Sequence, residues 1–298
     1  MLSIREQVKK GKLVCPMTRQ RLHFRENILE TTDGHHQYAI KGGVPILLPQ
    51  MGQEESDLEQ ERERMEREYA QLGRSSSLRA LLSRLAVRSG DYRSRGAKEA
   101  FEQVIGGQGV GALCLTVGGG PLRMHPNLVN LNIGPFPNVD VVGDAYALPY
   151  GDGVVDAIYC EAVLEHLEFP ERAVSEIYRV LHFGKQVFAA TPFIQPFHGY
   201  PGHYQNFTLV GHRRLFERER AGFKILSAGV CVGPTVALLD TMVVFAREYL
   251  PSYLFSRIAA NVLRLIFLPL RPLDFFLNRR SSAHILASST YVHAVKAE

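Results

Sequence analysis

The chain has 298 residues, of which 46% are hydrophobic and 21% are charged. A chain of this length can bury about 75% of its unfolded surface, enough for one large domain and a small one. The formal net charge of +4 is too small to indicate nucleic-acid binding, and the first residues lack the apolar core of a signal peptide. The four cysteines are far apart in the sequence, so we expect a protein of the reducing cytoplasm.

Residues 1–52 are predicted to form a small β module. The segments 13–22 and 38–49 are its two halves, and the turn Thr32-Asp33-Gly34 separates them. A structural zinc ion would need about four thiolate or imidazole ligands in paired spacing, and Cys15 has no second thiol nearby. We therefore expect a metal-free module that serves for docking or as a lid.

Residues 53–100 are predicted to be a helical linker. The run 54–72 is highly charged and favours a solvated helix. Four leucines between residues 78 and 88 then recur at the spacing of one helix face, with arginines beside them. Such a helix either packs on its own domain or lies on an anionic membrane surface.

A glycine-rich turn follows the first apolar strand of the main domain, which we place at residues 101–298. The strand 113–117 leads directly into Gly118, Gly119 and Gly120. Glycine accepts either sign of φ and has no Cβ, so a ligand can approach the backbone there.

Three more short apolar runs follow, at residues 129–133, 139–142 and 154–160, and each is closed by a polar residue. In an open α/β sheet, ligands bind outside the carboxyl ends of the strands, so these polar residues should converge with the glycine-rich turn on one pocket. The run 117–128 is barely long enough for a parallel crossover, so its helix is predicted to be very short.

These segments, taken in order, resemble the class I S-adenosylmethionine (SAM) dependent methyltransferases over about residues 108–225 and 288–296. The matching segments are Leu115-Thr-Val-Gly-Gly-Gly-Pro121, Val141-Val-Gly-Asp-Ala-Tyr-Ala-Leu-Pro149, Val155-Asp-Ala-Ile-Tyr-Cys-Glu-Ala-Val-Leu-Glu-His166, Glu176-Ile-Tyr-Arg-Val-Leu181 and Thr191-Pro-Phe193. The resemblance implies an α/β fold with a Rossmann-like, seven-stranded sheet, and SAM as the cofactor. The small N-terminal module resembles the zinc-ribbon-like activator subunit of methyltransferases.

The resemblance also implies a role for each residue of the cofactor site. Gly118 and Gly120 would pass beneath the methionine moiety and the ribose, Asn132 would face the ribose hydroxyls, and Asp144 with Ala145 would flank the adenine. The complete predicted cofactor set is Thr116, Gly118, Gly119, Gly120, Asn132, Asp144, Ala145, Glu161 and Ala162.

Two positions in this set depart from the family pattern. Thr116 and Asn132 stand where acidic residues are usual. An amide offers the ribose hydroxyls one neutral oxygen, so cofactor binding should be weaker by about 1 to 2 kcal/mol. The departures leave two interpretations open: an enzyme with weakened cofactor binding, or a degenerate methyltransferase fold that acts as a binding or scaffold protein.

The loop 193–208 is predicted to cover the site of methyl transfer. The sulfonium of SAM is already activated, so a general base is needed only for an acceptor of high pKa. His198 is the leading candidate for that base, followed by His203 and Tyr204, whereas His166 is expected to orient the loop. The sequence shows no carboxylate–histidine cluster with metal-ligand spacing, so no metal is expected.

Residues 233–285 form an apolar insertion before the last strand. Its two helical runs, 235–246 and 253–268, are unusually apolar for a surface segment. Charged residues interrupt both runs, and Pro269 and Pro272 should end the second, so neither is expected to span a bilayer. Such a hairpin suits the headgroup region of a membrane or a lid over a lipid substrate, and equally an extra core layer or a homodimer interface.

The sequence thus predicts a cytoplasmic methyltransferase with three parts: the small β module, the helical linker and the methyltransferase domain with its insertion. Its acceptor is expected to be a hydrophobic, lipid-linked or natural-product small molecule. For residues 233–285 the sequence leaves two alternatives open: peripheral contact with the cytoplasmic face of a membrane or a lipid acceptor, and an extra core layer or a homodimer interface.

Overall fold

The computed structural model describes residues 2–48, 93–109, 111–120, 123–198, 202–217 and 222–297. Most of the predicted linker, including its leucine-rich helix at 78–88, lies outside these ranges. The described end of the linker contains α4 (Arg95–Phe101), which continues into a π-helical turn at Glu102–Gly106.

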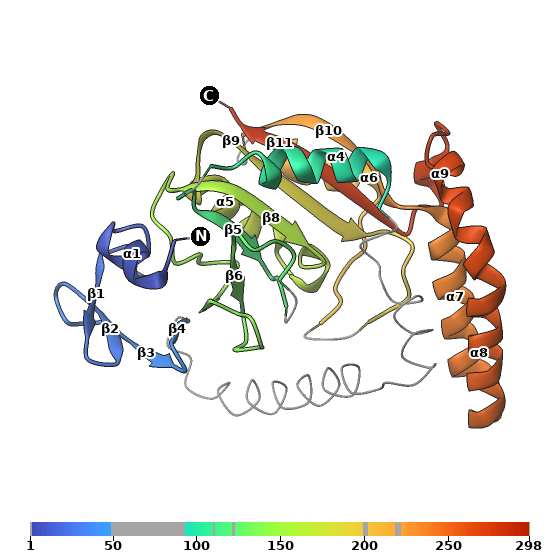
Figure 1. Ribbon diagram of the computed structural model, residues 1–298, viewed down its shortest axis with the longest axis horizontal. Helices are drawn as coiled ribbons and strands as arrows, with labels where there is room; N and C mark the ends of the chain where they lie inside the picture. The colour runs from blue at the N-terminus through green and yellow to red at the C-terminus, as the bar shows by residue number, and fades with distance from the viewer. Residues whose placement is uncertain are drawn as a thin grey trace.

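One mixed sheet of eleven strands runs through the described residues (Figure 1). The strands are β1 (Leu22–Arg25), β2 (Ile28–Thr31), β3 (Gln37–Lys41), β4 (Val44–Leu47), β5 (Cys114–Val117), β6 (Leu128–Asn132), β7 (Val141–Gly143), β8 (Val155–Glu161), β9 (Leu181–Pro192), β10 (Phe223–Val232) and β11 (Ser289–Lys296). Their order across the sheet is β1-β2-β3-β4-β7-β6-β5-β8-β9-β11-β10.

The central strands form the Rossmann-like sheet that the sequence predicts. Strands β7, β6, β5, β8 and β9 pair in parallel. Strand β11 is antiparallel to both β9 and β10, so β10 runs in the same direction as β9. The carboxyl ends of β5, β6, β7, β8, β9 and β10 therefore face the same edge of the sheet.

The sheet buries a core on each of its faces, because alternate side chains of a strand point to opposite sides. In β8, Ile158 and Cys160 pack in the core that includes residues of α5 (Pro170–Val180) and α6 (Leu209–Glu217). Ala157 and Tyr159 pack in the core that includes residues of α4.

The N-terminal strands extend this sheet. Strand β4 pairs in parallel with β7 through Ile46 and Leu47, and Leu13 forms a bridge with Tyr150. The predicted turn at residues 32–34 joins β2 to β3. A helix that the sequence analysis did not anticipate, α1 (Ile4–Lys9), begins at a capping box between Ser3 and Glu6. The module shares a hydrophobic core with the main domain, which explains how so small a unit is held in place.

The crossover from β5 to β6 contains no helix among its described residues, where a very short one was expected. The side-chain amide of Asn130 instead donates to the carbonyl oxygens of Gly120 and Asn138, at 2.9 and 3.0 Å. The first bond holds the crossover against β6, and the second holds the loop between β6 and β7.

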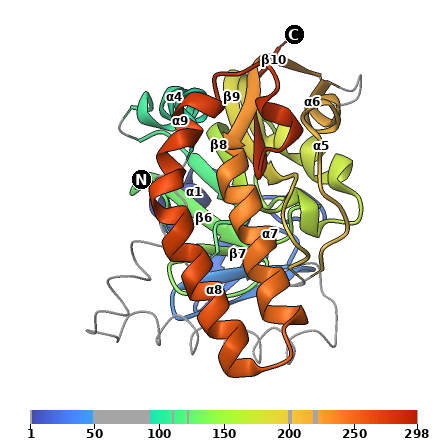
Figure 2. The ribbon, with the colours of Figure 1, turned by 90° about the vertical axis from the view of Figure 1, so that its right-hand side faces the viewer.

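The apolar insertion forms a helical hairpin beside the sheet (Figure 1). Helix α7 (Pro234–Tyr249) lies antiparallel to α8 (Tyr253–Phe267), and Figure 2 shows the pair side by side. The hairpin buries only a thin strip of its own, which includes Leu239, Val243 and Ala260.

Helix α8 ends at Phe267, just before Pro269, as the sequence predicts, but the helical path of the chain does not stop there. The chain continues through a 3-10 turn at Leu268–Leu273 into α9 (Asp274–Leu277). Pro269 lies in the first turn of the 3-10 segment and Pro272 lies inside it, so the two prolines change the type of helix without ending the helical path. The resulting helical segment, Tyr253–Leu277, is long enough and apolar enough to cross a membrane. This corrects the expectation that neither helical run of the insertion could span a bilayer.

Candidate functional site

A cavity of about 260 Å³ lies at the carboxyl ends of β5, β6 and β7. Its lining comes from the ends of four parallel strands, as the topology requires. The lining residues are Val117, Gly118, Gly120, Leu131, Asn132, Ile133, Phe136, Gly143, Asp144, Ala145, Ala162, Val163, His166 and Leu167. Six of the nine predicted cofactor residues are in this set.

The glycine-rich turn is shaped for close approach. Gly118 has φ +73, and a Cβ there would lie 2.1 Å from the side chain of Val163. Gly120 has φ +56, and a Cβ added to it would meet no atom within 4 Å, so its face toward the cavity is open. Gly118 thus serves the packing of the turn, and Gly120 leaves room for a ligand.

Two polar side chains stand at the cavity wall. The side-chain oxygen of Asn132 accepts a hydrogen bond from the backbone N–H of Gly134 at 3.2 Å. Asp144 Oδ1 accepts from the backbone N–H of Tyr146 at 2.8 Å. These bonds orient both side chains at the ends of β6 and β7, where a ribose and an adenine were expected.

Three predicted cofactor residues do not line the cavity. Thr116 is buried within β5, and a Cβ on Gly119 would collide with Thr116 and Asn130, so both residues pack beneath the turn. Glu161 forms an ion pair with the buried guanidinium of Arg93 and accepts a hydrogen bond from Tyr159. The pair with Arg93 holds the end of the linker against the sheet, and sequence reasoning could not foresee it because the two residues are far apart in the chain.

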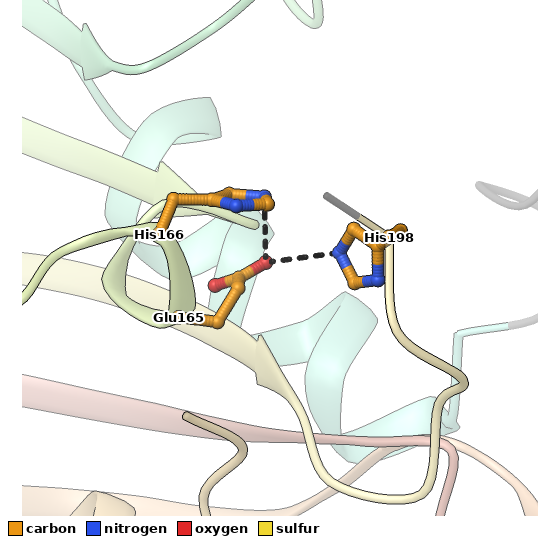
Figure 3. A group of neighbouring side chains, drawn as sticks. All are labelled: Glu165, His166 and His198. Atoms are coloured by element: carbon orange, nitrogen blue, oxygen red, sulfur yellow. Dashed lines mark ion pairs between the residues drawn. The ribbon is translucent and has the colours of Figure 1, made fainter. Parts of the chain in front are cut away.

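A second group of side chains lies beside the cavity, where the turn after β8 meets the loop after β9. Glu165 is fully buried, and Thr191 Oγ1 donates to its Oε2 at 3.0 Å. Burial raises the pKa of Glu165 to about 7. His166 Nε2 lies 3.8 Å from Glu165 Oε1, and His198 Nε2 lies 4.0 Å from the same oxygen (Figure 3).

This group corrects the expectation that the chain holds no carboxylate–histidine cluster. Ligand atoms of Glu165, His166 and His198 all lie within 4.8 Å of one another. The adjacent pair Glu165-His166 is visible in the sequence, but the approach of His198 depends on the path of a loop that follows the next strand. The expected role of His166 agrees with its contact, because its Nδ1 is hydrogen-bonded to the carbonyl oxygen of Gly202 in that loop.

The three predicted base candidates are placed differently. His203 accepts the backbone N–H of His198 on Nδ1 at 3.1 Å, and its Nε2 lies 2.7 Å from the side-chain oxygen of Asn206. Both ring nitrogens are therefore engaged, so His203 supports His198 rather than offering a free base. The side chain of Tyr204 is 60% exposed, whereas its backbone N–H donates to the carbonyl oxygen of Glu165 at 2.9 Å.

A larger cavity of about 620 Å³ lies between α4 and the helical insertion. Its basic lining residues include Arg93, Arg95 and Arg279, of which Arg93 and Arg95 are already paired with Glu161 and Glu99. This cavity does not reach the glycine-rich turn. The smaller cavity, at the strand ends, is therefore the candidate cofactor site.

Comparison with known proteins agrees with this assignment. Residues 125–189 match the family model described as a methyltransferase domain, which includes β6, β7, β8 and most of β9. The match agrees with the methyltransferase domain that the sequence predicts over these residues. No curated protein matches the sequence significantly.

Several solved structures are similar to the chain. The [4+2]-cyclase SpnF is 18% identical, with a TM-score of 0.40 and coverage of 68% of this chain and 81% of that one. Phosphoethanolamine N-methyltransferase 2 of Haemonchus contortus, in complex with SAM, is 14% identical, with a TM-score of 0.42 and coverage of 68% and 52%. A putative sarcosine dimethylglycine methyltransferase of Galdieria sulphuraria is 15% identical, with a TM-score of 0.43 and coverage of 68% and 83%.

Proposed function

We propose that the protein transfers a methyl group from SAM to a hydrophobic or lipid-linked small molecule at a membrane surface. The observation that carries this proposal is the exposed apolar surface of the α7–α8 hairpin. Its exposed large apolar side chains are Leu238, Met242, Phe245, Tyr249, Tyr253, Leu254, Phe255, Ile258, Val262, Leu265 and Ile266. The 3-10 turn and α9 that follow add Leu268, Leu270, Leu273, Phe275 and Phe276. So many exposed large apolar side chains on one helical hairpin are a feature of surfaces that meet a membrane or another protein.

The topology relates this surface to the cofactor cavity. Strand β10 runs parallel to β9, so its carboxyl end lies at the same sheet edge as the cavity, and α7 begins directly after it. A membrane contacted by the hairpin would therefore lie on the side of the domain where the acceptor must enter. This favours an acceptor drawn from the lipid phase.

The charges on the hairpin favour a surface position over a spanning one. Arg257 is exposed on α8, and Arg264 and Arg271 follow along the same helix. A spanning helix would carry these arginines into the hydrocarbon core, at a cost of roughly 2.5 to 3.5 kcal/mol each near its centre. In the headgroup region the apolar stem of the exposed Arg257 can stay buried while its guanidinium group meets anionic lipids.

Vesicle flotation tests the membrane part of the proposal. The protein should float with vesicles that contain anionic lipid, less with neutral vesicles, and less as salt is raised. The double substitution Phe255→Glu and Ile258→Glu should abolish flotation, because it places two charges on the apolar face. Val210→Glu is the matched control, since Val210 is 73% exposed on α6, away from the hairpin.

A different result would assign the apolar face to a homodimer. In that case the protein would sediment as a dimer, the double variant as a monomer, and neither would float. Methyl transfer from labelled SAM into a lipid extract tests the acceptor class directly. Transfer only to water-soluble acceptors would contradict the proposal.

A further inference from the structure

A buried glutamate and two histidines bring their ligand atoms together beside the cofactor cavity. Glu165 Oε1 lies 3.8 Å from His166 Nε2 and 4.0 Å from His198 Nε2. Figure 3 shows the two imidazole rings reaching the carboxylate from different segments of the chain.

Both histidines are held in the tautomer that leaves Nε2 without a hydrogen. His166 Nδ1 is bonded to the carbonyl oxygen of Gly202, and His198 Nδ1 lies 3.1 Å from the carbonyl oxygen of Pro196. A carbonyl oxygen can only accept, so each Nδ1 carries the hydrogen and donates it. In a neutral ring, Nε2 then presents a lone pair toward Glu165.

The carboxylate oxygen at the centre of this group has no hydrogen-bond donor. Glu165 Oε1 is buried and has no partner among the described residues, while Oε2 is bonded to Thr191. Three electron-pair donors thus face one another across less than 5 Å without a hydrogen between them. A positive charge at its centre relieves such an arrangement, either as a proton on one of the three groups or as a metal ion that all three bind.

We propose that Glu165 Oε1, His166 Nε2 and His198 Nε2 bind a divalent transition-metal ion. Two imidazoles and one carboxylate are the ligand set of catalytic zinc sites and of non-haem iron(II) sites. At zinc bond lengths of about 2.1 Å, tetrahedral ligand atoms are roughly 3.4 Å apart. The ligand atoms here lie within 4.8 Å of one another, so the loop that carries His198 would have to move inward when an ion binds.

The surroundings match those of metal-binding side chains. Metal-bound histidines commonly donate their other ring N–H to a backbone carbonyl, as His166 and His198 do here. The bond from Thr191 holds the carboxylate in the same way. His203 adds a further support, because it accepts the backbone N–H of His198.

The position of these three side chains beside the cofactor cavity indicates a role for the ion. His166 lines the cofactor cavity, so the open coordination positions would face the acceptor near the site of methyl transfer. An ion there would hold an oxygen of the acceptor and lower the pKa of a hydroxyl group. This role rests on the proposed function, whereas metal binding itself does not. His198 would then be a ligand rather than the general base.

Calorimetric titration of chelator-treated protein with Zn²⁺ tests the site, and Co²⁺ absorption reports the ligand geometry. We expect one tight site per chain in the absence of SAM and acceptor. His198→Ala should weaken Zn²⁺ binding by at least about 100-fold, more than is usual for losing an outer-shell partner. His182→Ala is the matched control, because His182 is exposed at the start of β9 and should leave the affinity unchanged.

The substitution of His198 decides the test, since its side chain is 42% exposed and on a loop, so that the fold should tolerate alanine. Glu165→Gln should also weaken binding, with thermal denaturation as the check on its folding. Zn²⁺ binding that both variants leave unchanged, or no binding at micromolar Zn²⁺, would overturn the proposal. Neither outcome bears on methyl transfer, which is measured separately.

Discussion

Gly118 and Val163 lie so close together that a Cβ on Gly118 would come within 2.1 Å of the Cγ2 atom of Val163. Gly118 also has φ +73, which favours glycine. The absence of a side chain on Gly118 therefore lets the end of β5 pack against the loop after β8. Substitutions at this position change the packing of the domain as well as the cofactor site.

Gly118→Ala should destabilise the protein more than Gly120→Ala. Both variants carry the strain of a left-handed backbone, about 1 to 2 kcal/mol, but only the first adds a collision. A Cβ on Gly120 has no atom within 4 Å. Thermal denaturation should show the larger loss for Gly118→Ala, and equal losses would contradict this account. Gly120→Ala should retain the fold while weakening SAM binding.

Asn132→Asp should tighten SAM binding by roughly tenfold, because a carboxylate accepts charge-assisted hydrogen bonds from both ribose hydroxyls. The side chain already accepts the backbone N–H of Gly134, and aspartate keeps that bond. Calorimetry with SAM measures the change. Asn127→Asp is the control, because Asn127 is exposed and lies just before β6. Asn130→Asp is unsuitable, because the side-chain amide of Asn130 donates to the carbonyl oxygens of Gly120 and Asn138. Weaker binding by Asn132→Asp would show that the ribose lies elsewhere.

The N-terminal module should fold without zinc. Cys15 is buried with its Sγ 3.0 Å from Tyr38 Oη, and the described residues place no second thiol beside it. Cys15→Ser should therefore leave the metal content of the purified protein unchanged, whereas His198→Ala should lower it. Elemental analysis of the two variants separates the module from the proposed metal site. A loss of zinc together with folding in Cys15→Ser would contradict this prediction.

Acid should destabilise the protein through His212. Burial lowers the pKa of this histidine from 6.5 to about 3, so the folded chain keeps it neutral while the unfolded chain binds a proton. The stability that His212 contributes is complete above pH 6.5 and is lost as the pH falls. The loss between pH 7 and pH 5 should be about 2 kcal/mol.

Urea denaturation at pH 7, 6 and 5 measures this loss. His212 Nδ1 lies 3.1 Å from Thr290 Oγ1, and His212→Asn can retain a hydrogen bond there without titrating. The difference between wild type and His212→Asn should shrink as the pH falls, because only the wild type loses the histidine contribution. A difference that stays constant from pH 7 to pH 5 would show that His212 is not the responsible group.

The main strands and the glycine-rich turn could be predicted from the sequence, because their signals are local. The predicted strand at residues 129–133 nearly coincides with β6, and the one at 154–160 nearly coincides with β8. Buried strands are continuous apolar runs, and the polar residue that closes each run marks its carboxyl end. For the same reason, Gly118, Asn132 and Asp144 could be assigned to one pocket from the sequence.

The tertiary structure alone decided which side chains meet across distant segments. Glu161 was expected in the cofactor site, but the pairing of its carboxylate with Arg93 depends on where the linker returns to the sheet. His198 approaches Glu165 because the loop after β9 folds back over the turn after β8. Local sequence carries no information on such approaches, since loop paths and side-chain directions follow from long-range packing. The positions of the strands in this protein thus follow from local sequence, whereas the chemistry of its site is set by tertiary contacts.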